Sequence, residues 1–158
     1  MSTVFSIGLR AAVGLLLLGS LMVQAAIPIN AQSAGEMFPE IAPLTVPYAI
    51  LAIVAIIGVQ IGLVATWRLA SMVSKDRIFD ASALKWVDII IAALSASTAL
   101  AAAVFVHLIF IVQVGGPPAL LGLGGAAALG VSLLLLLAVM RGLLVQAIDY
   151  RSELAAVV

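Results

Sequence analysis

The stretch SKDRIFDASALKW (Ser74–Trp86) separates two long apolar runs and is the one place in the chain where charge is dense. Its charged residues are Lys75, Asp76, Arg77, Asp80 and Lys85. Elsewhere Val, Ile, Leu and Ala dominate, so that 65% of the 158 residues are hydrophobic and only 9% are charged. Because a typical soluble domain has about 25% charged residues, this composition predicts an integral membrane protein that has the lipid bilayer as its solvent.

Four apolar segments approach the roughly 20 residues that a helix needs to cross the hydrocarbon core. The expected spans are residues 11–27, 46–67, 87–112 and 119–140, joined by loops 28–45, 68–86 and 113–118. We therefore expect one all-α domain, an antiparallel up-down bundle of four transmembrane helices. Pro28 is expected to end the first span, and the prolines at 39, 43 and 47 suggest an extended or irregular path for loop 28–45.

The positive charges predict how the chain lies in the membrane. With this assignment every Lys and Arg falls on one side: Arg10, Arg68, Lys75, Arg77, Lys85, Arg141 and Arg151. The positive-inside rule makes that side cytoplasmic, together with both termini. The segment RGLLVQAIDYRSEL (141–154) is amphipathic and is expected to continue the fourth helix past the headgroups. A cleaved signal peptide is the competing reading of the first span, but residues 1–9 lack the basic side chain that such a peptide needs.

Three polar residues within the spans are candidate functional positions, because ionisable and polar groups in a membrane are costly. We expect Asp88 to pair with Lys85 or with an arginine of a neighbouring span. We expect His107 to hydrogen-bond a backbone carbonyl or a polar side chain of the next helix. The alternative is that Asp88, His107 and Gln60 share a polar path in a small transporter, a channel or an accessory subunit of a membrane complex.

Small residues recur every four positions in the fourth span, at Gly122, Ala126 and Gly130. Such a ridge lets helices approach closely, so it predicts tight packing against another span or, in a homo-oligomer, another copy. Ser95–Thr98, flanked by alanines in the third span, suggests a similar contact.

The sequence contains few residues of the kinds that catalyse reactions or bind metals. There is no cysteine and only one histidine, and we find no catalytic set, so we expect no cofactor, no metal site and no enzymatic activity. The net charge is zero, which gives no basic face for nucleic acid.

The stretch RIFDASALKWVDIIIAAL (Arg77–Leu94) resembles the signature of a bacterial family of four-span membrane proteins, domain of unknown function 2975 (DUF2975). The residues that carry the resemblance are Arg77, Phe79, Asp80, Leu84 and Lys85, although Asp80-Ala81 stands where many members have Glu-Asn. The resemblance implies a bacterial inner-membrane protein that could partner a cytoplasmic transcriptional regulator, because members are often encoded beside a small helix-turn-helix protein.

The same residues also have a plain structural interpretation. Asp80 can cap a helix N-terminus, Phe79 can dip into the interface, and the Lys85 ammonium can reach the headgroups. The motif is therefore either a folded hairpin or a docking site for a cytoplasmic protein.

Overall fold

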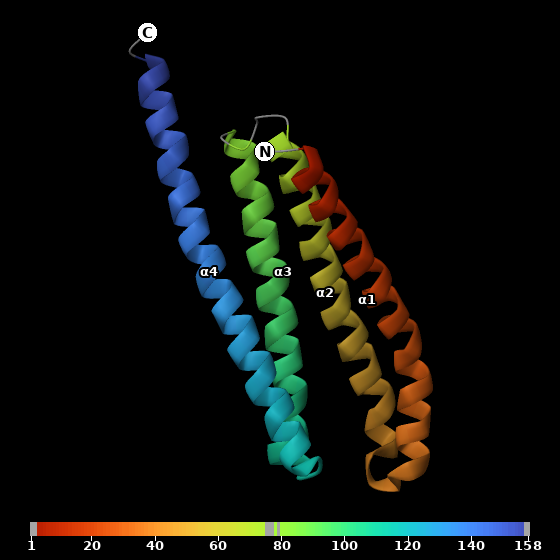
Figure 1. Cartoon of the computed structure of the whole chain (residues 1–158). Helices are drawn as coiled ribbons and strands as arrows, with labels where there is room; N and C mark the ends of the chain where they lie inside the picture. The colour runs from red at the N-terminus through yellow and green to blue at the C-terminus, as the bar shows by residue number, and fades with distance from the viewer. Residues whose placement is uncertain (1–2, 75–77, 79, 157–158) are drawn as a thin grey trace.

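The computed structural model describes residues 3–74, 78 and 80–156, and these residues are all-helical. Four long helices account for nearly all of them (Figure 1). They are α1 (Thr3–Met37), α2 (Ala42–Ser74), α3 (Ala81–Val106) and α4 (Gly116–Ala156). Each is long and apolar enough to cross a membrane, which confirms the predicted fold class of an all-α, multi-pass membrane protein.

The helices stand in a row rather than around a common centre. Among the described residues α1 packs on α2, α2 on α3 and α3 on α4, and no packing joins helices that are not neighbours in sequence. Figure 1 accordingly shows α1 and α4 at the two edges of the row. No large side chain is fully buried among the described residues, and many leucines and isoleucines are exposed. Such a surface suits hydrocarbon, which covers apolar side chains as well as a protein core does.

The two ends of the row differ. We call the end that holds both chain termini and the α2–α3 connector the charged end, because Arg10, Arg68, Lys85 and Arg141 lie towards it. We call the other end, with the α1–α2 and α3–α4 connections, the hairpin end (Figure 1).

The prediction for loop 28–45 is wrong. Helix α1 continues through Pro28 to Met37, and only Phe38 and the 3-10 turn η1 (Pro39–Ile41) separate it from α2. A membrane helix tolerates proline because other groups satisfy the backbone that proline leaves unpaired. Pro28 removes the helical donor of the Gln24 carbonyl. The side chains of Asn30 and Ser33 donate hydrogen bonds to the nearby carbonyl oxygens of Ala26 and Ile29, at 2.9 and 3.1 Å.

The expected inner loop, 68–86, is also shorter than predicted. Helix α2 runs on to Ser74 and α3 begins at Ala81, because the residues flanking the charge cluster are compatible with a helix. Asp80 takes the expected N-cap position with an extended backbone, although its side chain makes no capping hydrogen bond. Arg77 and Phe79, together with Lys75 and Asp76, lie outside the described residues.

The α3–α4 connection overlaps the predicted loop 113–118, but it is shorter because α4 begins at Gly116. Helix α3 ends in a single π-helical segment, η2 (His107–Ile111), and the chain then reverses through three residues with positive φ. These are Gln113 at 58°, Gly115 at 106° and Gly116 at 47°. Glycine adopts such a backbone at little cost, whereas Gln113 does not.

Glycines set the closest helix approaches. Gly58 of α2 lies against Ser97 of α3, while Gly122 and Gly130 of α4 lie against Phe105 and Thr98 of α3. The predicted ridge on the fourth span is therefore used within one chain. A second copy would need another face of α4.

Candidate interaction surface and polar helix contacts

Polar and aromatic side chains form a band near the charged end. The Arg10 guanidinium of α1 donates a hydrogen bond to Ser74 Oγ of α2 at 3.2 Å. The Arg68 guanidinium lies 6.0 Å from the centre of the Trp86 ring, at the limit of a cation–π contact between α2 and α3. Arginine and tryptophan favour the membrane–water boundary, so this band has the composition that is expected there.

Asp88 and Arg141 join α3 to α4 in the same band. Arg141 Nε donates to Asp88 Oδ1 at 2.5 Å, and Arg141 Nη2 lies 3.4 Å from Oδ2. The Asp88 side chain is 51% exposed and the Arg141 side chain is 43% exposed. An arginine of a neighbouring span was one of the partners expected for Asp88. A two-point contact of this kind fixes orientation as well as distance, so it sets the register of α4 on α3.

Beyond Arg141, α4 continues for fifteen residues, which we call the α4 extension (Gly142–Ala156). At 1.5 Å per residue this segment is about 22 Å long. Figure 1 shows that it projects past the ends of the other three helices. Tyr150 and Leu154 on it are 66% and 72% exposed. The expected continuation of the fourth helix is confirmed, and the extension forms a stalk at the charged end.

The described residues of the family motif lie at the start of α3, also at the charged end. Lys85 is exposed, whereas Leu84 and Asp80 are partly buried. The alanine and valine between and after them, Ala83 and Val87, are among the few buried residues of the chain. The first turns of α3 therefore combine a packed side with an accessible lysine.

His107 belongs to the hairpin end. Its Nδ1 lies 2.7 Å from the Tyr48 hydroxyl of α2, and the two rings meet edge to face with centroids 5.9 Å apart. This contact confirms that His107 bonds a polar side chain of the next helix. It also places a polar pair where η2 interrupts the regular hydrogen bonding of the helix.

Gln60 lies in a third place, between α1 and α2. Its side-chain amide donates to Ser20 Oγ at 3.1 Å and to Gln24 Oε1 at 3.0 Å. Hydrogen bonds of this kind hold membrane helices together because hydrocarbon offers no competing partner.

The structure does not bring the three polar candidates together. Asp88 and His107 are nineteen residues apart on one continuous helical segment, which corresponds to about 28 Å. Gln60 contacts α1, His107 contacts α2 and Asp88 contacts α4. Each side chain therefore serves a different helix pair.

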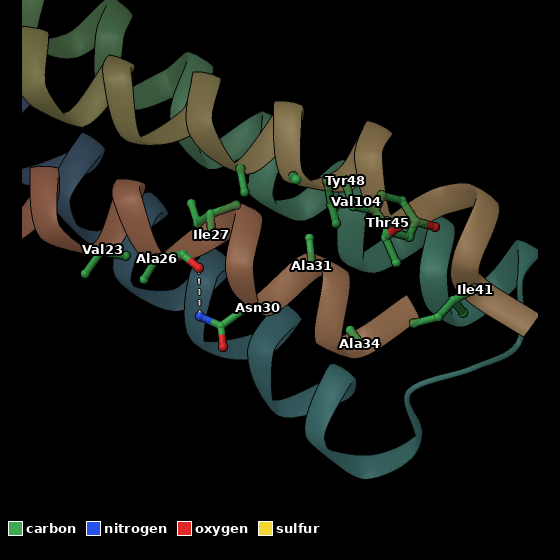
Figure 2. A pocket seen from close by; sticks show the side chains of 12 residues that line it. Val23, Ala26, Ile27, Asn30, Ala31, Ala34, Ile41, Thr45, Tyr48 and Val104 are labelled. Carbon is green, nitrogen blue, oxygen red and sulfur yellow. Dashed lines mark hydrogen bonds between the residues drawn. The ribbon is translucent and has the colours of Figure 1, made fainter. Parts of the chain in front are cut away.

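A cavity of about 600 Å³ opens between α1 and α2 near the hairpin end, with Val104 of α3 contributing to its wall. Figure 2 shows alanines along it, including Ala26, Ala31 and Ala34. Asn30, Thr45 and Tyr48 are its polar members, and each already makes a hydrogen bond within the chain. The cavity is thus an apolar slot without converging reactive groups.

Among the described residues no group of three or more His, Asp or Glu side chains could hold a metal ion.

Sequence reasoning missed the partners Tyr48, Ser20 and Gln24. Ser20 and Gln24 are four residues apart, so they share a helix face, and that spacing could have indicated a polar contact. Tyr48 lies near the start of the second predicted span and His107 lies towards the end of the third, so the two residues are expected at a similar depth. This similarity indicates a contact only when the two helices are known to pack together.

Comparison with protein families finds a match to DUF2975, a protein of unknown function, over residues 29–158. Comparison with curated proteins and with solved structures finds no match.

Proposed function

Since the chain belongs to the DUF2975 family, whose description names no activity, we propose from its structure that it is a non-enzymatic protein of the bacterial inner membrane that acts through protein contacts at a cytoplasmic charged end. The α4 extension is the observation that carries this proposal. It projects beyond the helix row and contributes nothing to the packing of Gly122 and Gly130 on α3. A helix of this length that leaves the membrane presents side chains to other molecules.

The charge distribution supports a cytoplasmic location. Every Lys and Arg that the structure describes lies towards the charged end, and the positive-inside rule predicts that such an end faces the cytoplasm. The hairpin end, by contrast, carries Glu36 and Glu40.

The proposed docking surface is the polar side of the α4 extension together with the start of α3. Asp149 and Glu153 are four residues apart and exposed, so they lie on one face of the helix. Lys85 adds an exposed positive charge at the same end of the row. A surface of mixed charge suits a soluble protein, and a cytoplasmic transcriptional regulator is the partner that we propose.

Affinity purification of the full chain from native membranes tests this function. We compare Asp149→Asn with Glu153→Gln against the matched pair Glu36→Gln with Glu40→Gln at the hairpin end. Loss of co-purifying cytoplasmic proteins from the first variant alone supports the proposal. Identical partners for both variants and the wild type argue against this docking surface.

A small transporter that uses Asp88 and His107 is less well supported, because these residues lie in separate helix contacts. Flux through proteoliposomes that is abolished by both Asp88→Asn and His107→Ala would favour the transporter instead.

A further inference from the structure

Apolar side chains recur along α4 at alternating spacings of four and three residues. We call these eight positions the α4 stripe: Leu129, Leu133, Leu136, Met140, Leu143, Ala147, Tyr150 and Leu154. Alternation of four and three is the heptad pattern that places a and d residues along one seam of a coiled coil. Eight consecutive positions correspond to about four heptads, the length at which the pattern becomes typical of coiled coils.

The surroundings of the stripe change along α4. Leu129, Leu133 and Leu136 border grooves shared with α2 and α3, whereas the positions beyond Arg141 belong to the α4 extension, which projects past the other helices. Arg141 contacts Asp88 and therefore marks the side of α4 that packs on α3. Tyr150 follows Arg141 by nine residues, which at 3.6 residues per turn places it on the opposite side of the helix. Every stripe residue except the small, partly buried Ala147 is exposed. Figure 1 shows no helix beside the projecting end of α4, which forms an edge of the row.

The half of the stripe beyond Arg141 is the informative half. Within the hydrocarbon all sides of α4 are apolar, and lipid covers the sides that do not pack on α3. The helix has 41 residues, or about 61 Å at 1.5 Å per residue, so a hydrocarbon core of about 30 Å cannot contain it. The α4 extension therefore enters water with Leu143 at 56%, Tyr150 at 66% and Leu154 at 72% exposure.

We propose that the half of the α4 stripe beyond Arg141 pairs with the same half in a second copy of this chain, forming a short parallel two-helix coiled coil where α4 projects past the other helices. Copies inserted in the same orientation present their stripes parallel and at equal depth, so the heptads of the two chains lie in register. Such an interface is two-fold and self-complementary, as in most homodimers. In this register Gln146 of one copy lies opposite Arg151 of the second copy, so the flanking positions oppose no like charges.

This inference goes beyond the proposed function, because it uses the apolar side of the α4 extension and not the polar side that carries Asp149.

The absence of cysteine from the chain makes a disulfide scan clean. Single cysteines are placed at the four stripe positions 143, 147, 150 and 154 and at the control positions Val145, Asp149 and Ser152. Membranes are then oxidised with copper phenanthroline, which accepts the electrons when two thiols form a disulfide. We expect dimer bands at the stripe positions and their loss at the controls. Equal bands at all positions, or none at the stripe, would overturn the proposal.

Light scattering of the purified full chain in detergent provides a second readout that needs no cysteine. We expect the mass of two chains for the wild type and for Asp149→Asn, and of one chain for Tyr150→Glu with Leu154→Glu, because charge in the seam removes apolar burial. A single-chain mass for the wild type, or an intact dimer with both glutamates, contradicts the coiled coil. A single-chain mass would contradict dimerisation but would not change the co-purification result expected for Asp149→Asn with Glu153→Gln. The two proposals are therefore tested independently.

Discussion

Gly122 of α4 lies so close to Phe105 of α3 that a Cβ atom on the glycine would come within 2.6 Å of the ring. The contact leaves no room for a side chain at position 122, since real Cβ atoms keep a larger distance from their neighbours. Together with Gly130 against Thr98, it makes small residues the basis of α3–α4 packing, in line with how helices associate in lipid.

The first prediction follows from this contact. Gly122→Leu forces Phe105 to move and should lower the free energy of unfolding by about 1–3 kcal/mol, the usual cost of overpacking. Titration with SDS in dodecyl maltoside micelles, followed by circular dichroism, measures the loss. Gly124→Leu is the matched control because nothing lies within 4 Å of that glycine. Equal destabilisation by the two variants would show that the ridge does not set the packing.

The second prediction concerns the polar pair at the hairpin end. Tyr48→Phe removes the hydroxyl that bonds His107 and should destabilise the α2–α3 contact by about 0.6 kcal/mol, the average for such bonds in membranes. A double-mutant cycle with His107→Leu isolates the pair. Additive effects of the two single variants would mean that the hydroxyl and the imidazole do not interact.

The third prediction uses the ion pair between Asp88 and Arg141. Reversing one charge, by Asp88→Arg, should loosen α4 from α3, whereas adding Arg141→Asp should restore the contact with the charges exchanged. Titration with SDS, as for Gly122→Leu, measures the loss of stability in the single variant and its recovery in the double variant. Equal stability of all three proteins would exclude a role for the pair in positioning α4.

The fourth prediction concerns Gln60. Replacing Gln60 by Leu removes both hydrogen bonds to α1, so the α1–α2 contact should weaken more than with Ser20→Ala, which leaves the bond to Gln24 in place. The same SDS titration gives both values. A larger loss for Ser20→Ala would contradict this hydrogen-bond network.

The sequence was sufficient to predict four apolar helices, because length and hydropathy restrict that feature. For His107 it left two partners open, a backbone carbonyl or a polar side chain, and the Tyr48 hydroxyl is of the second kind. The sequence misled at Pro28, where the rule for water-soluble helices does not hold in a membrane. The order of the helices in the row could not be predicted from the sequence, since a helix that is apolar on every side does not indicate which side packs on its neighbour. The α4 extension was predictable because residues 141–154 are amphipathic, whereas the span before them is apolar on every side.

Site-specific photocrosslinking in native membranes tests most directly whether the charged end contacts a cytoplasmic protein. A photoreactive residue replaces Ser152, which leaves Asp149 and Glu153 in place, and the matched control replaces Ser33 near the hairpin end; both serines are exposed. If the charged end acts through protein contacts, position 152 yields a discrete adduct with a cytoplasmic protein and position 33 does not. Adducts with lipid alone from position 152 would contradict the proposed function.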